Sequence, residues 1–372
     1  MSKINLYDLS LPELNERFAR WEEPAYRAKQ VWEWLYQHKV STFDAMSNLP
    51  RALREKLDAE TQIGDLEQVD EQFSNDGQTV KRLFRLPDNQ LIESVLMEYD
   101  DGRRTACIST QAGCAMGCVF CATGQMGFVR HLTSGEIIQQ ALFFARQLEA
   151  EGGRLSNIVL MGMGEPLHNY DNTLKAIRKL VDPTAFNIGQ RHITLSTVGL
   201  IPGIRRLATE DLQIGLAISL HAATDQERSK LLPVNNRWPI SELMTAVQDY
   251  IGVTGRRVTF EWALIRGEND TVEQARRLGL LLAGLLCHVN LIPLNPTGGY
   301  NGGPQFFLQR GQVRPNFERP DRAVALLAGL ASLGIAPERP TPAILAELRT
   351  VHDADYLSFL EHASAAWAAL PD

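Results

Sequence analysis

Three of the five cysteines in this 372-residue chain lie within eight residues, in the order Cys114-Ala-Met-Gly-Cys118-Val-Phe-Cys121. Thiolates are soft ligands, and they suit zinc and iron–sulfur clusters. Structural zinc takes four ligands, usually from two paired C-x2-C turns, and the sequence has no second pair. We therefore interpret the C-x3-C-x2-C motif as the ligand set of a [4Fe–4S] cluster. A zinc site and unrelated core cysteines are the alternatives.

Three thiolates on a four-iron cluster leave one iron without a protein ligand. That iron can chelate a small molecule through an amino group and a carboxylate, and S-adenosylmethionine (SAM) offers both groups. One electron from the cluster can cleave the SAM sulfonium to a carbon radical, which is chemistry of the cofactor and not of side chains. The cysteine spacing resembles that of the radical SAM superfamily, so we expect a [4Fe–4S] cluster and SAM as cofactors.

The composition indicates a globular protein of the cytoplasm. Apolar residues make up 44% of the chain and charged residues 22%, and the length fits one core of about 200–250 residues with additions. No run of about 18 apolar residues is present, so we expect no membrane contact. The first residues lack an apolar signal segment, and the few cysteines outside the motif favour a reducing compartment. These features predict a cytoplasmic location.

A net charge of −7 does not indicate a nucleic-acid-binding protein, but a global balance can hide local basic patches. Short basic pairs occur at residues 103–104, 130–131, 191–192, 205–206 and 256–257. Each pair alone is typical of solvated surface, so composition leaves RNA binding open. If RNA is bound, we expect the pairs near the mouth of the fold to contribute.

Residues 1–65 are predicted to form a small helical domain that docks RNA. Ser10 is an N-cap candidate followed by Pro12, so a helix is expected from there to about residue 21. Apolar residues at helical spacing predict further helices over 26–38 and 50–57. The domain is rich in aromatic residues: Trp21, Trp32, Trp34 and Tyr36. These rings either fill a small core or help to dock a structured RNA by base stacking.

Residues 66–100 are predicted to form a β-hairpin extension. Strand-like segments at 79–86 and 90–97 flank a turn at Pro87-Asp88-Asn89. Glu93 interrupts an otherwise apolar stretch of the second segment. The residues alone favour a solvent-facing Glu93 over a carboxylate placed for function.

Residues 101–300 alternate strands and helices. The strands are expected at 104–110, 157–161, 191–196, 214–220, 257–265 and 288–294, and the main helices at 134–148, 171–180, 240–251 and 272–286. Thr133 and Glu136 resemble a capping box at the first helix. Six βα units in series predict an α/β fold, a partial (β/α)6 TIM-like barrel. Chemistry in such barrels lies after the carboxyl ends of the strands, and the cysteine motif follows the first strand.

Polar and glycine residues follow the later strands of the predicted barrel. The segment 162–166, Gly-Met-Gly-Glu-Pro, lets the backbone approach the amino group of SAM. Ser196, Ser219, His221 and Asn295 stand at other strand ends, where they can bind ribose and carboxylate groups. Each of them alone is equally consistent with loop capping, and His221 with a packed histidine. Residues 301–372 are predicted to be a loop followed by helices at 321–333 and up to about 370.

Five motifs in this order resemble the RlmN/Cfr family of radical SAM RNA methyltransferases, over about residues 4–335. They are Cys107 with the cysteine motif, MGMGEP at 161–166, LST at 195–197, ISLH at 218–221 and NLIP-x-NP at 290–296. The resemblance implies cluster ligands at Cys114, Cys118 and Cys121. It implies SAM contacts at Gly164, Glu165, Ser196, Ser219, Leu220, His221 and Asn295. It also implies two catalytic roles, Glu93 as the proton acceptor and Cys107 as a thiol that helps to resolve a covalent enzyme–RNA adduct.

The resemblance further implies the reaction and the partners. RlmN-type members methylate C2 of an adenine in large-subunit rRNA and in tRNA beside the anticodon, and Cfr-type members act at C8 of the ribosomal adenine. Adenine C2 is electron-poor, so the family routes the methyl group through a cysteine near its C-terminus and a radical on the resulting thioether. The implied partners are rRNA, tRNA and an electron donor such as flavodoxin or ferredoxin, and we expect a monomer.

One feature of the family is missing from this sequence. The family's methyl-carrying cysteine stands in an Ala-Cys-Gly-Gln-Leu-like stretch just after the segment matching Gly334-Ile335, whereas this chain has no cysteine after Cys287. A reading-frame change near Pro337, or a divergent or inactive homologue, would explain the difference. We expect an RlmN-type enzyme with an interrupted relay. The alternatives are a radical SAM enzyme for another substrate, with hydrogen abstraction only, and a non-catalytic RNA-binding homologue.

Overall fold

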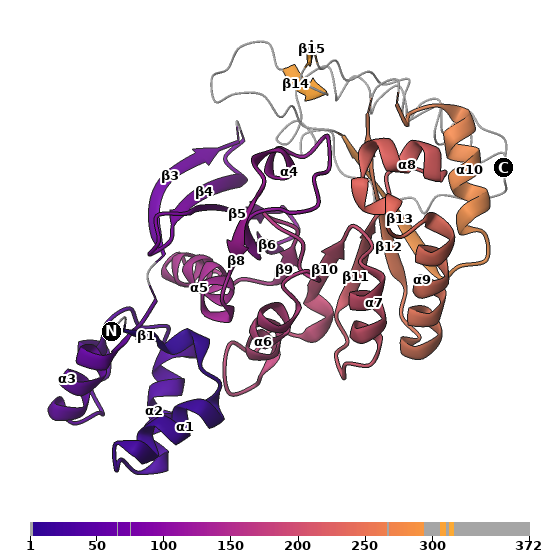
Figure 1. Ribbon diagram of the computed structural model, residues 1–372. Coiled ribbons are helices and arrows are strands. Elements are labelled where there is room, and N and C mark those ends of the chain that lie inside the picture. The colour runs from indigo at the N-terminus through magenta and orange to yellow at the C-terminus, as the bar shows by residue number, and fades with distance from the viewer. Residues whose placement is uncertain are drawn as a thin grey trace.

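A computed structural model of the chain describes residues 3–64, 66–74, 76–265, 268–293, 306–309 and 312–315. Its central feature is a nine-stranded sheet that runs across the molecule (Figure 1). In sheet order the strands are β13 (Cys287–Pro293), β12 (Val258–Leu264), β11 (Gly215–Ser219), β10 (Ile193–Thr197), β9 (Asn157–Leu160), β6 (Arg104–Cys107), β5 (Leu91–Glu98), β4 (Thr79–Arg85) and β3 (Glu67–Phe73).

Six strands of this sheet, β6, β9, β10, β11, β12 and β13, run parallel to one another, and helices connect them. The helices are α5 (Ser134–Ala150), α6 (Tyr170–Val181), α7 (Ile201–Ala208), α8 (Asp225–Leu231), α9 (Ile240–Thr254) and α10 (Val272–Leu282), with short 3-10 turns η3 (Gln190–His192) and η4 (Pro233–Asn236). Figure 1 shows α5, α6, α7 and α9 following one another along the sheet. This arrangement confirms the predicted partial barrel of six βα units.

Local signals place the longest helix, α5. The Thr133 hydroxyl accepts from the Glu136 N–H at 3.1 Å, and the Glu136 carboxylate accepts from the Thr133 N–H at 2.9 Å. This is the predicted capping box, and it satisfies two backbone donors at the helix start. Thr271 and Gln274 form a further capping box at α10, which the sequence analysis did not single out.

Residues 66–100 form three strands and not only a hairpin. The predicted hairpin is present as β4 and β5, and β3 adds to its outer edge. On the other side β5 pairs antiparallel with β6, with Val95 opposite Cys107. The segment therefore extends the barrel sheet by three strands. Long-range pairing of this kind has no local signal in the sequence.

The two faces of the sheet differ in chemistry. One face buries apolar side chains such as Ile158, Leu195 and Ile218 in the same core as the helices. Because side chains alternate along a strand and paired residues share a face, the register defines the opposite face. We call it the inner face. It carries, from β5 to β13, the side chains of Glu93, Cys107, Ser196, Ser219, Glu261 and Asn290.

The N-terminal helices lie at one end of the molecule (Figure 1). Their elements are β1 (Ile4–Asn5), η1 (Leu6–Asp8), α1 (Leu11–Arg20), α2 (Ala25–Tyr36), η2 (Phe43–Ala45), α3 (Arg51–Glu60) and β2 (Thr61–Gln62), which confirms the three predicted helices. Trp32 and Tyr36 are buried, and their ring centroids are 4.4 Å apart. Trp21 and Trp34 are partly buried against the same core. The aromatic residues thus fill a small core.

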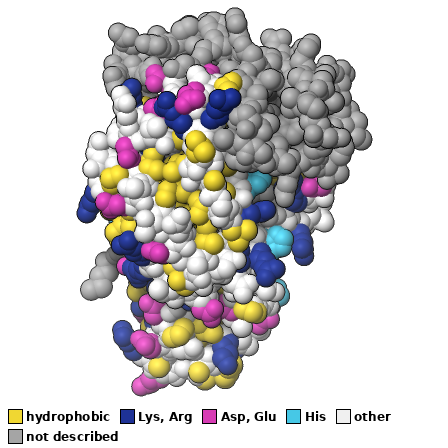
Figure 2. Space-filling model, turned by 90° about the vertical axis from the view of Figure 1, so that its right-hand side faces the viewer, with side chains coloured by type: hydrophobic (Ala, Val, Ile, Leu, Met, Phe, Trp, Pro, Cys, Tyr) yellow, Lys and Arg dark blue, Asp and Glu magenta, His cyan; other side chains and the backbone are white. Residues whose placement is uncertain are grey.

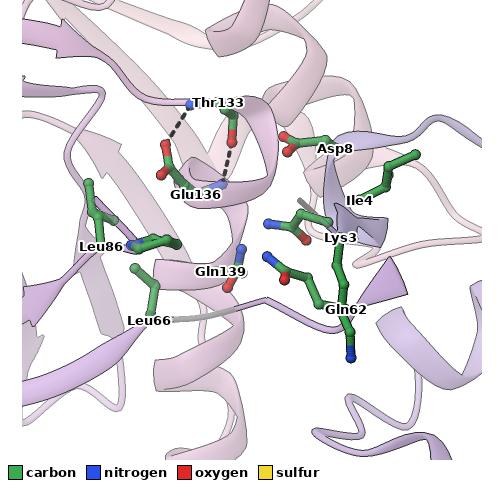
Figure 3. A pocket seen from close by; sticks show the side chains of 11 residues that line it. Lys3, Ile4, Asp8, Gln62, Leu66, Leu86, Thr133, Glu136 and Gln139 are labelled. Atoms are coloured by element: carbon green, nitrogen blue, oxygen red, sulfur yellow. Dashed lines mark hydrogen bonds between the residues drawn. The ribbon is translucent and has the colours of Figure 1, made fainter. Parts of the chain in front are cut away.

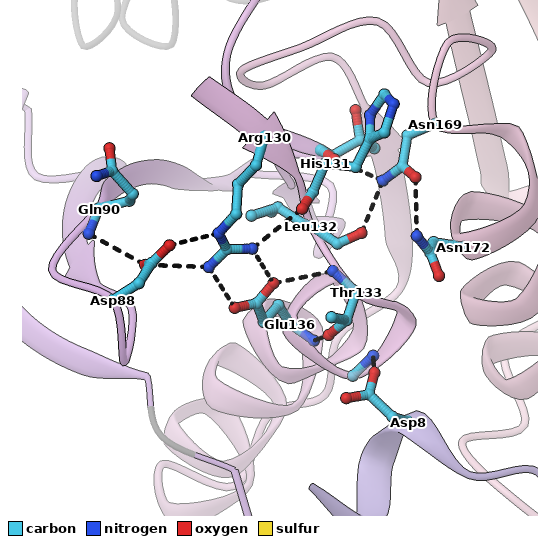
Figure 4. Close-up of polar contacts among 12 residues, drawn as sticks. Asp8, Asp88, Gln90, Arg130, His131, Leu132, Thr133, Glu136, Asn169 and Asn172 are labelled. Carbon is cyan, nitrogen blue, oxygen red and sulfur yellow. Dashed lines mark hydrogen bonds and ion pairs between the residues drawn. The ribbon is translucent and has the colours of Figure 1, made fainter. Parts of the chain in front are cut away.

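Polar contacts join this N-terminal unit to α5 and α6. The Asp8 carboxylate accepts from the Gly135 N–H at 2.7 Å, as Figure 4 shows. The buried Lys179 ammonium donates to the Tyr7 carbonyl and to the Ser134 hydroxyl. Burial lowers the pKa of Lys179 to about 7. Asp8 and the buried Lys179 therefore each have a partner on the other side of the junction.

A cavity of about 330 Å³ lies at this junction (Figure 3). Its lining mixes charges of both signs with apolar side chains, including Lys3, Asp8, Glu136, Leu66 and Leu86. It contains none of the residues predicted to form the site. The cavity therefore belongs to the contact between the N-terminal unit and the sheet.

The remaining described elements are short. Strand β7 (Gln111–Gly113) pairs with β8 (Phe128–His131), and β14 (Phe306–Gln309) pairs with β15 (Gln312–Pro315). The helices predicted over 321–333 and up to 370 lie outside the described residues. Among the helices that the structure describes, none combines the length and apolarity needed to cross a membrane.

Candidate functional site

The three cysteines lie in one loop after β7, closed by α4 (Ala122–Met126). The Cys114 N–H donates to the Gly127 carbonyl at 2.8 Å, and the Cys121 N–H donates to the Cys118 carbonyl at 3.2 Å. A Cβ on Gly124 would lie 2.9 Å from the Cys118 carbonyl oxygen, so α4 can close on the loop only with glycine there. These contacts hold the three free thiols on a single compact turn.

The loop rests on apolar walls. Cys118 packs with Leu231, Leu232 and Ile265. Burial raises the pKa of the Cys114 thiol to about 11, and burial together with the neighbouring cysteines raises that of Cys118 well above its usual range. A bound cation reverses this preference, because metal binding displaces the thiol proton.

The donor set fits an iron–sulfur cluster. It consists of three soft sulfur ligands in a largely dry pocket, which is the environment these clusters take. No group of three or more His, Cys, Asp and Glu side chains within the described segments is arranged to hold a metal ion. In a four-iron cluster each thiolate binds a different iron, so the cluster interpretation requires no such group.

The glycine segment after β9 lies directly beside β6 and β7. A Cβ on Gly164 would lie 2.6 Å from the Gln111 side chain, and its φ of +102° favours glycine. The Met163 N–H donates to the Ser109 hydroxyl at 2.8 Å, and the Glu165 N–H donates to Gln111 Oε1 at 2.9 Å. The backbone of the segment is therefore held next to the connection that leads into the cysteine loop.

The Glu165 carboxylate is buried and joins two strand-end loops. It accepts from the Leu167 N–H at 3.0 Å and from the Val198 N–H at 2.9 Å, which lies after β10. Burial raises the pKa of Glu165 to about 7. Its side chain acts as a tie between the loops that follow β9 and β10.

Ser196 and Ser219 meet on the inner face, where their hydroxyl oxygens are 3.4 Å apart. They come from the carboxyl ends of β10 and β11, as predicted. Leu220 is fully buried, and its N–H donates to the Glu261 carbonyl at 3.1 Å. Asn295, the last of the predicted SAM contacts, lies outside the described residues.

His221 is a packed, neutral histidine next to the cysteine loop. Its Nδ1 accepts from the Ala263 N–H at 2.9 Å, so the ring proton is on Nε2. Burial lowers the pKa of His221 to about 3. The Phe120 ring of the cysteine loop packs edge-on against it, with centroids 4.9 Å apart. The side chain can donate a hydrogen bond from Nε2 but does not change its charge near neutral pH.

Glu93 and Cys107 share the inner face. Glu93 is half-buried, and its carboxylate lies 3.0 Å from the Lys81 ammonium. Its carbonyl accepts from the Ser109 hydroxyl at 2.5 Å, which links it to the glycine segment. Burial raises the pKa of the Cys107 thiol to about 12. The sequence analysis did not predict Lys81 as a partner of Glu93. Alternation of side chains along the two strands of the predicted hairpin puts both residues on the same face and could have indicated the pair.

Arg228 is the site residue that the sequence concealed most completely. It is 1% exposed and donates to the carbonyls of Leu220 at 3.1 Å and Ser219 at 3.2 Å, and to Asn235 Oδ1 at 3.0 Å. Burial lowers the pKa of Arg228 to about 10. Arg228 thus fixes the backbone at the end of β11 through hydrogen bonds to two carbonyls, next to the cysteine loop. In the polar run 225–231, DQERSKL, nothing distinguishes it from its neighbours.

Most of the basic pairs lie near the amino ends of the strands, whereas the candidate site lies at the carboxyl ends. The pairs at 103–104, 191–192 and 256–257 begin or precede β6, β10 and β12, and the pair at 205–206 ends α7. Only Arg130 and His131 lie near the cysteine loop, and the Arg130 guanidinium is held by Asp88 and Glu136 (Figure 4). Figure 2 shows basic and acidic side chains interspersed over the face that it presents. Of the five basic pairs, the one at 130–131 thus remains as a candidate RNA contact at the mouth.

Comparisons with known proteins agree with this architecture. Two family models match the chain, Ribosomal RNA large subunit methyltransferase N-terminal domain over residues 4–63 and Radical SAM superfamily over residues 108–279. A crystal structure of a radical SAM methyltransferase from Sphaerobacter thermophilus aligns with a TM-score of 0.81 and 48% identity, covering 89% of this chain and 93% of that one. The fold and the cysteine loop thus define a radical SAM enzyme.

Curated relatives show which family of radical SAM enzymes the chain resembles. Dual-specificity RNA methyltransferase RlmN 1 from Myxococcus xanthus is 55% identical over 347 residues, which cover 91% of this chain and 96% of that protein. Probable dual-specificity RNA methyltransferase RlmN from Chloroflexus aurantiacus is 52% identical over 310 residues, which cover 80% of this chain and 82% of that protein. The chain belongs to the RlmN family of radical SAM RNA methyltransferases.

Proposed function

We propose that the chain is built to methylate C2 of an adenine in large-subunit rRNA and in tRNA beside the anticodon. The observation that carries the proposal is the inner face, which brings Glu93 and Cys107 onto the same surface as Ser196 and Ser219. The names of the relatives support RNA as the substrate. A carboxylate and a thiol beside a cofactor site are the groups that proton removal and adduct resolution require.

The proposed cofactor ligands follow the strand ends. Cys114, Cys118 and Cys121 would hold a [4Fe–4S] cluster, and SAM would bind beside it. The SAM contacts come from Gly164, Glu165, Ser196, Ser219, Leu220, His221 and Asn295. When bound, the cluster supplies the electron that cleaves SAM reductively. The chain's own part is to hold SAM against the inner face and to keep water out with apolar walls such as Leu231 and Ile265.

Glu93 is placed to accept the ring proton. The Lys81 ammonium lies 3.0 Å from its carboxylate and holds the side chain on the inner face. The Cys107 side chain lies on the same face, on the adjacent strand β6. Burial raises the pKa of its thiol, so the thiol is protonated at neutral pH. A small reducing protein such as flavodoxin or ferredoxin supplies electrons, and the enzyme works as a cytoplasmic monomer.

Methyl transfer by this route needs a further thiol, which carries the methyl group to the RNA. The sequence has five cysteines, of which three hold the cluster, Cys107 ends β6 and Cys287 begins β13. No thiol is left to carry the methyl group from the C-terminal segment. This observation favours a second candidate, in which the chain as written cleaves SAM without completing methyl transfer.

The test uses anaerobically reconstituted protein with dithionite, SAM and either tRNA or a large-subunit rRNA fragment. We expect 5′-deoxyadenosine, no new methyladenosine in the RNA and no added methyl group on the intact protein. Methyladenosine together with a methyl group mapped to Cys107 or Cys287 would show that the relay has moved. Absence of 5′-deoxyadenosine from cluster-loaded protein would favour a non-catalytic RNA-binding protein.

A further inference from the structure

Glu261 is a buried carboxylate that the proposed function does not use. It lies in the middle of β12, and its side chain is on the inner face because its register partners are Ser219 on β11 and Asn290 on β13. The residue is 5% exposed. Its position is one strand from Ser219 and two from Ser196. Its backbone carbonyl accepts from the N–H groups of Leu220 and His221, so the residue is an integral part of the SAM-contact segment.

The Glu261 carboxylate is buried but accepts one hydrogen bond from the side chains of the described residues. Asn290 Nδ2 donates to Oε2 at 2.8 Å. Among the described residues, no other side chain bonds to the carboxylate and no cation pairs with it. Burial raises the pKa of Glu261, which expresses the cost of keeping a charge there. Buried carboxylates are ordinarily paired or multiply hydrogen-bonded. Oε1 has no hydrogen bond within the described residues and is not among the side-chain atoms sealed from solvent, so a ligand can reach it.

Resting on the proposed function, we propose that Glu261 binds the 2′,3′-diol of the ribose of SAM, with Asn290 holding the carboxylate in position. Two vicinal hydroxyls donate to one carboxylate, the pairing by which acidic residues bind ribose in nucleotide sites. A nucleotide inside an RNA chain has its 3′ oxygen in a phosphodiester and offers no free diol. The diol chemistry therefore points to SAM and not to the target nucleotide.

The test measures binding and not turnover. S-adenosylhomocysteine, which carries the same ribose, is titrated calorimetrically into cluster-loaded wild-type protein and into Glu261→Gln. The substitution keeps the shape and an acceptor for Asn290 but removes the charge, so we expect affinity to fall about tenfold or more. The matched control is Glu242→Gln on the exposed side of α9, which should bind as the wild type does.

A second ligand separates ribose binding from other causes. The 2′-deoxyribose analogue of S-adenosylhomocysteine should bind the wild type weakly, and Glu261→Gln should weaken it far less than it weakens the parent ligand. Equal loss with both ligands would show that Glu261 acts on a positive charge or on the fold, and would overturn the proposal. Unchanged affinity of Glu261→Gln would overturn it too.

Two controls keep the result interpretable. If Glu261→Gln fails to load iron, Glu261→Asp takes its place, because it keeps the charge, withdraws the oxygens by one carbon and should also weaken the parent ligand selectively. A wild-type protein that carries its cluster but binds neither SAM nor S-adenosylhomocysteine would reject the proposed function itself. Tight wild-type binding with no loss in either variant would reject only the role of Glu261.

Discussion

The N-terminal junction and the inner face both bury polar groups, but they treat them differently. At the junction, Asp8 bonds to the Gly135 N–H and the buried Lys179 ammonium bonds to the Tyr7 carbonyl, each across the contact. On the inner face and in the cysteine loop, Glu261, Cys114 and Cys118 are buried with few or no such partners. Buried side-chain atoms without a hydrogen bond also occur in the N-terminal unit, for example Trp32 Nε1 and the Tyr36 hydroxyl. A lack of partners alone therefore does not mark a site; what distinguishes the inner face is that its polar side chains lie together at the strand ends beside the cysteine loop.

The largest effect should come from the cysteine loop. Replacing Cys118 by Ala should abolish the iron–sulfur absorbance, because a cluster with only two thiolate ligands is not retained. Reconstituted wild type should carry about four irons per chain, measured by iron and sulfide analysis alongside the absorbance. Cys287→Ala is the matched control and should load normally. Full iron in Cys118→Ala, or tight zinc in the wild type, would contradict the assignment of the cysteine loop to an iron–sulfur cluster.

Arg228 sharpens the comparison because it is a satisfied polar group inside the site. Arg228→Met should lower the free energy of unfolding by about 3 kcal/mol, since several buried carbonyls lose their donor. Denaturant titration measures the change, with the exposed Arg205→Met as the control. A loss of less than about 0.5 kcal/mol, the range of surface substitutions, would mean that these hydrogen bonds do not hold the strand ends.

His221 is also a buried polar group of the site, and it should make the free energy of unfolding depend on pH. Its folded-state pKa of about 3 lies below the ordinary value of 6.5, so between those values the unfolded chain binds a proton that the folded chain does not. The stabilising contribution is complete above pH 6.5 and shrinks as the pH falls. Between pH 8 and 5.5 the wild type should lose about 1.4 kcal/mol more than His221→Asn, measured by denaturant titration at both pH values. Equal losses would contradict a neutral buried ring.

The smallest effect should come from the exposed part of the junction. Lys175 and Glu13 form an ion pair of 2.8 Å, with both side chains substantially exposed. Lys175→Met should cost about 0.5 kcal/mol, and less at high salt, because solvent screens such pairs. Thermal unfolding at low and high salt measures it. A loss of several kcal/mol would show that the junction depends on its surface charges and not on its buried contacts.

Much of this structure could be predicted because its signals are local. The capping boxes at Ser10 and Thr133 place α1 and α5, and the run of strands and helices predicts the parallel barrel. The cysteine loop and the glycine segment after β9 are short motifs whose chemistry depends on spacing along the chain. Both therefore appear in the sequence at the positions where the structure has them.

The parts that were missed depend on distant contacts. Pairing of β5 with β6 brings Glu93 to the inner face, and no local pattern records which strand will be its neighbour. Arg228 looks like any residue of a short polar helix until the carbonyls of Ser219 and Leu220 surround it. The basic pairs misled for the same reason, since their position relative to the strand ends is a property of the whole sheet.

The central claim is that the cysteine loop holds a four-iron cluster with one iron open to SAM on the inner face. Electron paramagnetic resonance of the dithionite-reduced protein, recorded with and without SAM, tests it most directly. The account predicts a [4Fe–4S] signal that changes shape and g values when SAM is added, because the cofactor then binds the open iron. A cluster signal that stays the same at saturating SAM, or a reduced protein with no such signal, would contradict the account.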